Sequence, residues 1–202
     1  MNNTNNYIIT KYSLDANAKS PLLIPHVSRD DLAGLFHELG FKSGAEIGVE
    51  KGKFSEVLCR ANPGVKLYCI DPWLQYSEYR DTLNNVDLLN KYYEETKNRL
   101  SNYNCELIRK YSIDAVKDFK PESLDFVYID GNHHFDYVAE DIIHWSKIVR
   151  PGGIVSGHDY REDNNEKVPF HVIAATHAYA EAHKITPWFV LPRSSTWFWV
   201  KT

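Results

Sequence analysis

The sequence lacks the features that mark disulfide-bonded, membrane-spanning and nucleic-acid-binding proteins. Its 202 residues include only three cysteines, an odd number at wide spacing, which supports neither a disulfide framework nor a zinc motif. No apolar run is long enough to cross a bilayer, and a net charge of −4 offers no basic surface for a phosphate backbone. Because the N-terminus is polar and lacks a signal-peptide core, we expect a cytoplasmic protein that binds neither nucleic acid nor membrane.

Two nucleotide-binding fingerprints are missing as well. The dinucleotide motif G-x-G-x-x-G needs a second glycine where the pyrophosphate approaches the backbone. Here Gly48 is followed by Val49 and then by Glu50, whose carboxylate would repel a pyrophosphate. The lysine pattern of a phosphate-binding P-loop is also absent. These gaps disfavour an NAD-dependent oxidoreductase.

The sequence does contain a regular alternation of strand-like and helix-like segments. Such alternation predicts a single α/β domain with a mostly parallel sheet and helices on both faces. The last two strands have no helix between them, so they should pair antiparallel. We expect seven strands, at residues 45–49, 66–71, 106–108, 126–129, 154–157, 188–191 and 196–200.

Helical periodicity and capping residues place the helices between these strands. The domain is expected to span residues 28–202, after an arm at residues 1–27 that has no strong period and should lie on the surface. We expect helices at residues 28–39, 54–60, 87–100, 112–116, 135–149 and 168–183.

The strand at residues 126–129 organises the chain, because it is apolar and stops on an acid, Asp130. Gly131 and Asn132 then allow a turn, and His133 follows. Ligands of open α/β sheets bind just beyond the carboxyl ends of the strands. Asp130 is therefore a candidate site residue, although a helix N-cap or an ordinary loop acid is the simpler reading.

Other strands end in the same way. Asp71 closes the second predicted strand, Asp159 follows the fifth, and Gly48 closes the first. If these strands are neighbours, their ends form one rim of the sheet. An acid at the end of the second strand is placed to bind ribose hydroxyls. Together with Glu46 and a loop unsuited to phosphate, it favours a nucleoside that carries positive charge, such as S-adenosylmethionine.

The order and spacing of these motifs resemble class I S-adenosylmethionine-dependent methyltransferases, which have a Rossmann-like sheet with an antiparallel seventh strand. The resemblance is closest to the branch of macrocin-type O-methyltransferases of antibiotic sugars and more distant to catechol O-methyltransferases. It covers roughly residues 40–200 and rests on residues 46–52, Asp71, Ser112, residues 129–133 and residues 150–160.

The resemblance implies roles for individual residues. Gly48 would contact the methionine part of the cofactor, Asp71 its ribose and Ser112 its adenine. Asp130 would lie between cofactor and metal, and Asp130 and Asp159 would hold Mg²⁺ or another divalent cation. The full set expected to bind the cofactor is Glu46, Gly48, Gly52, Asp71, Ser112 and Asp130.

Two positions bear on the chemistry that the resemblance implies. His133 stands where the macrocin-like group has a histidine, and it would act as the general base in catalysis together with Asp130. A histidine that only hydrogen-bonds a loop carbonyl is the alternative. Tyr160 occupies the position of the usual third metal ligand, where the family has Asp or Asn, and a tyrosine is a poor ligand for Mg²⁺.

Two functions of different classes follow. The first is an enzyme that transfers a methyl group to a hydroxyl of a small molecule or sugar. The second is a non-catalytic nucleoside- or sugar-binding protein with the same fold. A homo-oligomer is compatible with either. Four aromatic residues are candidates for an acceptor wall, with ordinary loop packing as the alternative: Trp73, Tyr76, Tyr79 and Tyr160.

Overall fold

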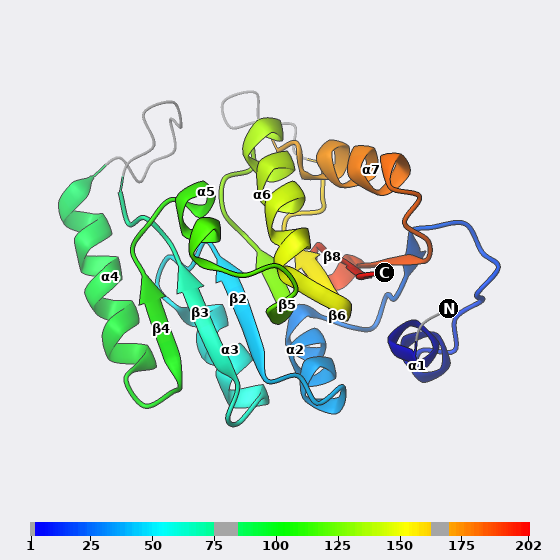
Figure 1. The fold of residues 1–202 in the computed structure, drawn as a ribbon, viewed down its shortest axis with the longest axis horizontal. Helices are drawn as coiled ribbons and strands as arrows, with labels where there is room; N and C mark the ends of the chain where they lie inside the picture. Colours follow the sequence, from blue (N-terminus) through cyan, green and yellow to red (C-terminus); the bar gives the residue numbers. More distant parts are fainter. Residues whose placement is uncertain (1–2, 75–84, 163–169) are drawn as a thin grey trace.

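The computed structural model describes residues 3–74, 85–162 and 170–202, which form one eight-stranded sheet with helices on both faces (Figure 1). The strand order is β1-β7-β8-β6-β5-β2-β3-β4. The strands are β1 (Leu22–Leu23), β2 (Ser43–Ile47), β3 (Lys66–Ile70), β4 (Cys105–Ile108), β5 (Leu124–Ile129), β6 (Val149–Gly157), β7 (Trp188–Leu191) and β8 (Thr196–Val200).

Strand directions follow the prediction. β8 lies between β6 and β7 and runs antiparallel to both, whereas the other pairs in the sheet are parallel. The seven predicted strands are present, and six of them begin and end within two residues of their expected limits. The exception is β6, which begins at Val149 because that residue already pairs with Leu124 of β5. The predicted α/β fold is therefore confirmed.

The helices divide into two groups, one for each face of the sheet. In Figure 1, α2 and α3 lie behind the strands and α6 lies in front of them. The helices are α1 (Asn3–Lys11), α2 (Arg29–Glu38), α3 (Lys53–Ala61), α4 (Val86–Leu100), α5 (Ser112–Ala115), α6 (Phe135–Ile148) and α7 (Val172–Ala182), with 3₁₀ turns at Val116–Asp118 and Pro192–Ser194. The predicted start of the last helix, at residue 168, lies outside the described residues.

Each face of the sheet has its own apolar core. Behind the sheet, Phe36 of α2 stacks on Phe126 of β5 with a centroid distance of 4.2 Å. In front, the stripe of α6 formed by Val138, Ile142 and Trp145 is buried, as its helical spacing predicts. Since β5 and β2 are covered on both faces, the ends of the central strands are held rigidly.

The arm predicted for residues 1–27 contains two elements that the sequence did not indicate, so it is not simply a surface segment. Ile8 of α1 is fully buried. Leu22 of β1 pairs with Phe189 of β7 and adds an eighth strand at the edge of the sheet. α1 is polar overall and β1 has two residues, so both depend on packing against the domain rather than on local pattern.

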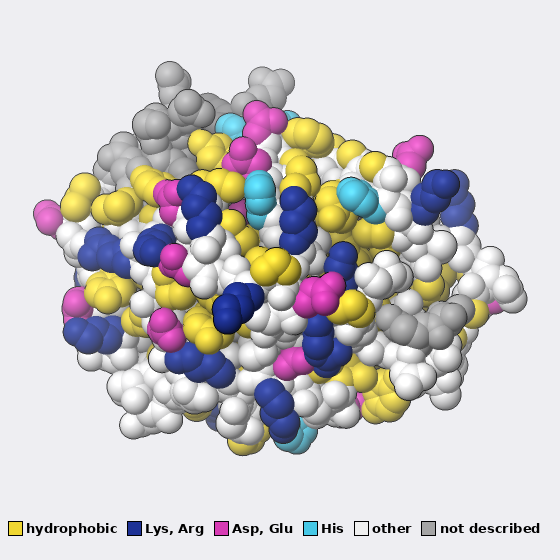
Figure 2. All heavy atoms as spheres, in the orientation of Figure 1, with side chains coloured by type: hydrophobic (Ala, Val, Ile, Leu, Met, Phe, Trp, Pro, Cys, Tyr) yellow, Lys and Arg dark blue, Asp and Glu magenta, His cyan; other side chains and the backbone are white. Residues whose placement is uncertain are grey.

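Charged side chains of both signs lie on the surface of the molecule. Figure 2 shows Lys and Arg side chains interspersed with Asp and Glu across one face of the molecule. Among the described helices, none is both long enough and apolar enough to cross a membrane.

Candidate active site

The central strands β6, β5, β2 and β3 are neighbours, and they bring the predicted rim together. A cavity of about 650 Å³ opens at their carboxyl ends, a size typical of small-molecule sites. Of the six residues expected to bind the cofactor, five line this cavity: Glu46, Gly48, Asp71, Ser112 and Asp130. Gly52 is the exception.

Gly48 and Gly52 are glycines for different structural reasons. Gly48 has a φ of +85°, and a Cβ atom there would overlap the backbone carbonyl of Asp130. Glycine is therefore required for the loops after β2 and β5 to pass each other at the cavity wall. Gly52 has a φ of +67° at the start of α3, and its Cβ would lie 2.9 Å from Cγ2 of Thr96. Gly52 thus serves the packing of α3 against α4.

Asp71 fastens the loop that follows β2. Its Oδ2 atom accepts hydrogen bonds from the backbone N–H groups of Val49 and Glu50, at 3.0 and 2.9 Å. Its Oδ1 atom accepts one from the N–H of Trp73 at 2.7 Å. Burial raises the pKa of Asp71 above its ordinary value, although these three hydrogen bonds act in the opposite direction.

Glu46 is a second buried acid in the cavity wall. Its side chain is held by a hydrogen bond that the hydroxyl of Ser55 donates. Burial raises the pKa of Glu46 to about 8, with a smaller contribution from the charge of Asp130. At neutral pH this carboxyl is therefore largely protonated, and a cationic ligand would favour its ionised form.

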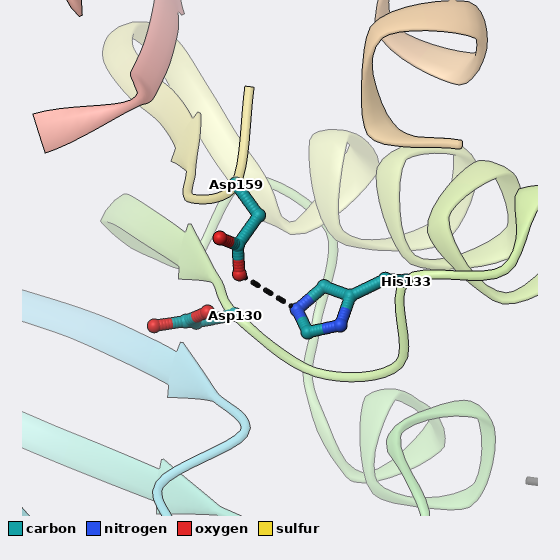
Figure 3. Close-up of side chains that lie close together, drawn as sticks. All are labelled: Asp130, His133 and Asp159. Carbon is teal, nitrogen blue, oxygen red and sulfur yellow. Dashed lines mark ion pairs between the residues drawn. The ribbon is translucent and has the colours of Figure 1, made fainter. Parts of the chain in front are cut away.

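Asp130, His133 and Asp159 converge beside the cavity, from the turns that follow β5 and β6 (Figure 3). One ligand atom from each lies within 4.8 Å of the other two. The Nε2 atom of His133 is 2.8 Å from Oδ2 of Asp159. The structure thus joins the predicted base and the two predicted metal ligands into one cluster.

Further charged residues surround this acid–histidine cluster. Nδ1 of His158 lies 3.3 Å from Oδ2 of Asp159, and Nε of Arg161 lies 3.1 Å from its Oδ1. Nη1 of Arg29 lies 3.5 Å from Oδ2 of Asp130. Arg29 is the first residue of α2, far from the rim in sequence, and no local pattern pointed to it.

The two carboxyl groups of the cluster have pKa shifts of opposite sign. Burial alone would raise the pKa of Asp159, but hydrogen bonds from His133 and His158 outweigh it and hold the pKa well below its usual range. Burial dominates for Asp130 and raises its pKa, even though His158 acts to lower it. Neighbouring acids whose pKa values are shifted in opposite directions are typical of functional sites.

Tyr160 does not join the cluster. Its hydroxyl is 2.7 Å from Nε2 of His177 on α7, and its backbone N–H donates to the carbonyl of Ser195. His133 therefore supplies the third donor atom near Asp130 and Asp159, at a different position in the chain from the family's usual third ligand.

The proposed aromatic wall is only partly described. Trp73 lines the cavity, but its indole is buried and its Nε1–H donates to the carbonyl of Glu50 at 2.7 Å. Tyr76 and Tyr79 lie outside the described residues. For Trp73 and Tyr160, the structure favours packing and hydrogen bonding within the protein over an open stacking surface.

Ser112 belongs to a short chain of hydrogen bonds that includes a residue not predicted from the sequence. Trp145 Nε1–H donates to Ser112 Oγ at 2.7 Å, and the Ser112 hydroxyl donates to Oδ1 of Asp141. Asp141 is buried and also lines the cavity. Burial raises the pKa of Asp141 to about 7, while the hydrogen bond from Ser112 acts to lower it.

Comparisons with solved structures support the fold. The O-methyltransferase of Bacillus cereus in complex with SAH is 17% identical, with a TM-score of 0.58, over 100% of this chain and 92% of that one. TomG of Streptomyces achromogenes, an O-methyltransferase in complex with SAM, is 16% identical, with a TM-score of 0.56, over 100% of this chain and 91% of that one. The N-methyltransferase NodS of Bradyrhizobium japonicum WM9 is 12% identical, with a TM-score of 0.59, over 86% of this chain and 94% of that one.

Comparisons of the sequence give the family. No curated protein matches the chain. Residues 45–160 match the methyltransferase domain family, and this segment runs from the start of the first predicted strand to the residue after Asp159. Because the match covers more than half of the 202 residues, the chain belongs to the methyltransferase domain family and is an S-adenosylmethionine-dependent methyltransferase.

Proposed function

We propose that this methyltransferase transfers its methyl group to a hydroxyl of a small molecule or sugar. The observation that carries the proposal is the convergence of Asp130, His133 and Asp159 beside the cavity (Figure 3). A hydroxyl must lose its proton as the new bond forms, so a positioned base next to the methyl donor suits this reaction. Within the class, we propose the macrocin-type branch for this chain.

We place S-adenosylmethionine, which supplies the methyl group when bound, in the cavity at the ends of β2 and β3. Its sulfonium and ammonium groups are positively charged, and the cavity wall contains the buried acid Glu46 and the partly buried acids Asp71 and Asp130. Burial raises the pKa of all three because it disfavours their ionised forms, and a cationic ligand would favour the ionised forms by pairing with them. Asp71 would accept from a ribose hydroxyl through Oδ1, which accepts one hydrogen bond within the protein, whereas Oδ2 already accepts two.

We assign the general base to His133. Asp159 lies 2.8 Å from its Nε2 atom, and the ring of Phe170 stacks on the imidazole with a centroid distance of 4.5 Å. A carboxylate and a flat surface therefore orient the ring from two sides. An imidazole oriented by a carboxylate is a recurrent arrangement for a base that receives a proton.

The acid–histidine cluster also fits a divalent cation. Two carboxylates and one imidazole nitrogen offer a mixed oxygen and nitrogen donor set within a 4.8 Å span. Mg²⁺ prefers oxygen ligands, whereas Mn²⁺, Fe²⁺, Co²⁺ and Zn²⁺ accept imidazole readily. We therefore propose that Asp130 and Asp159, with the imidazole of His133 as the third donor, hold a transition-metal ion rather than Mg²⁺. When bound, it would supply positive charge to the acceptor oxygen.

The proposal is tested by binding and by transfer. Calorimetric titration should show binding of S-adenosylhomocysteine but not of NADH. Radiolabelled S-adenosylmethionine should label sugars or catechols in preference to amines of the same shape. If NADH binds and S-adenosylhomocysteine does not, the proposed placement of the cofactor is wrong. If the label enters only amines, the proposed hydroxyl acceptor is wrong. Tight binding without transfer to any acceptor would favour the non-catalytic alternative.

A further inference from the structure

The carboxyl group of Asp141 is held in one orientation by a directed chain of hydrogen bonds. Trp145 Nε1 can only donate, and it donates to Ser112 Oγ at 2.7 Å. The Ser112 hydroxyl then donates its own proton to Oδ1 of Asp141. Because the direction of each step is set by the indole, Oδ1 must act as an acceptor toward Ser112.

The second oxygen of Asp141 faces the cavity. The side chain is only 7% exposed, yet Asp141 and the neighbouring Gly131 both line the cavity. A Cβ atom added to Gly131 would have Oδ2 as its nearest neighbour, at 3.6 Å. Among the described residues, the hydrogen bond from Ser112 is the one donated to this carboxyl, and it goes to Oδ1. Oδ2 therefore has acceptor capacity left at the wall of the cavity, where a ligand can donate a hydrogen bond to it.

The surroundings of Oδ2 suit a flat, weakly polar ring rather than a charged ammonium. Ile47 and Gly131 line the cavity beside Oδ2, and Ile47 Cγ2 lies 3.8 Å from the position that a Cβ atom of Gly131 would take. Two other acids of the lining, the buried Glu46 and the partly buried Asp71, lie at the ends of β2 and β3. A cationic group would therefore find more negative charge at those strand ends, whereas Oδ2 of Asp141 has the side chain of Ile47 and the backbone of Gly131 beside it.

We infer that Asp141 reads the nucleobase of the cofactor, with Oδ2 accepting a hydrogen bond from the exocyclic amine of adenine. The inference rests on the proposed placement of S-adenosylmethionine in this cavity. An amine presents N–H at this edge of the base, whereas a deaminated purine presents a carbonyl oxygen, which an ionised carboxylate repels. Asp141 is then the residue that selects adenosyl over inosyl compounds.

The hydrogen-bond chain makes a sharp prediction for Asp141→Asn. Ser112 still has to donate, so the amide oxygen of the asparagine turns toward Ser112 and its NH₂ group takes the place of Oδ2. The variant would then present a donor where the wild type presents an acceptor. Adenine should be disfavoured and the carbonyl of hypoxanthine favoured, which is a reversal of preference rather than a loss of binding.

The experiment is calorimetric titration of S-adenosylhomocysteine and S-inosylhomocysteine at about pH 8.5, above the pKa of Asp141. In the wild type, the adenosyl compound should bind about 10- to 100-fold more tightly, the usual weight of a hydrogen bond to a charged group. Asp141→Asn should remove or invert this ratio. Glu140→Gln is the matched control, because it removes a neighbouring charge of the same cavity lining and should leave the ratio unchanged.

The outcomes separate this inference from the proposed function. If neither compound binds the wild type, the cofactor placement fails. If both bind the wild type equally, or if Asp141→Asn weakens both to the same degree, Asp141 acts through its charge or as a structural residue, and the inference is overturned. Thermal unfolding of each variant shows whether it is folded. A second variant, Ser112→Ala, should also narrow the ratio, because Asp141 then loses the donor that orients it.

Discussion

The Nε2 atom of His133 lies 2.8 Å from Oδ2 of Asp159, which links the residue after β5 that we assign as the base to an acid after β6. This contact allows two states of the cluster. Asp159 can orient His133 as a base, or both can bind one cation together with Asp130. The two states differ in what the removal of each side chain should do.

Replacing His133 should affect transfer and not cofactor binding. His133→Ala should lower the rate of methyl transfer by about 10²–10⁴-fold, the usual contribution of a positioned base. The affinity for S-adenosylhomocysteine should change little, because the ring acts on the acceptor. His134→Ala is the control: its backbone N–H bonds to Asn132, but its side chain is not part of the cluster. Equal small losses in both variants would exclude the base role.

Cation binding should depend on Asp159. Asp159→Asn should weaken binding of Mn²⁺ by at least about tenfold while leaving the affinity for S-adenosylhomocysteine nearly intact, because a neutral amide is a poorer ligand than a carboxylate. Calorimetry with the metal alone measures this without any acceptor, and Asp136→Asn, an acid in the first turn of α6, is the control. Binding of Mg²⁺ that is tighter than that of Mn²⁺, or full activity in excess chelator, would contradict the proposed donor set.

Asp71 should contribute to the stability of the fold as well as to binding of the cofactor ribose. Asp71→Ala leaves the N–H groups of Val49, Glu50 and Trp73 without their acceptor. Each such group costs about 1–3 kcal/mol where it is shielded from water. Asp71→Asn keeps one acceptor oxygen and should unfold at a higher temperature than the alanine variant. If the asparagine variant binds S-adenosylhomocysteine as tightly as the wild type, Asp71 serves only to hold the loop.

The raised pKa of Glu46 should appear in the pH dependence of folding. Its folded-state pKa is about 8 against an ordinary value of 4.5, so the native state binds the proton more tightly than the unfolded chain. The stability that this gives is complete below about pH 4.5 and is lost as the pH rises through about 8. Glu46→Gln should therefore gain stability relative to the wild type across this window, with a slope of at most about 1.4 kcal/mol per pH unit.

Denaturant unfolding at several pH values measures the difference between Glu46→Gln and the wild type. Glu38→Gln is the control, because a hydrogen bond from Lys11 lowers the pKa of Glu38 and the difference should then be nearly flat over the same window. A flat difference for Glu46→Gln as well would mean that Glu46 is not protonated in the native state at neutral pH.

Much of the fold and the rim could be predicted because the relevant signals are local. Asp130 and Asp71 each directly follow a short apolar run, so one short stretch of sequence predicts both the strand and the acid at its end. The sequence leaves open whether the strands before Gly48 and Asp130 are neighbours, and the strand order of the structure shows that they are. The clash that forces glycine at position 48 involves the carbonyl of Asp130, a contact across the sheet that no local pattern displays.

The residues that were missed come from helices whose approach is set by tertiary packing. Arg29 reaches Asp130 across about a hundred residues of sequence, so spacing says nothing about it. Asp141 did leave a signal: it falls between Val138 and Trp145 on the buried stripe of α6, where an acid needs a reason to be present. Tyr160 was noted at the expected third ligand position, but only the structure shows that His177 holds it elsewhere.

The short strand β1 has a practical consequence for anyone who shortens the protein. It covers the outer edge of β7, where Leu22 pairs with Phe189 and the N–H of Ile24 donates to the carbonyl of Val190. A version limited to residues 28–202 would leave that apolar edge open, and open edges of this kind recruit strands from other molecules. Light scattering should then detect self-association in the shortened protein but not in the full chain.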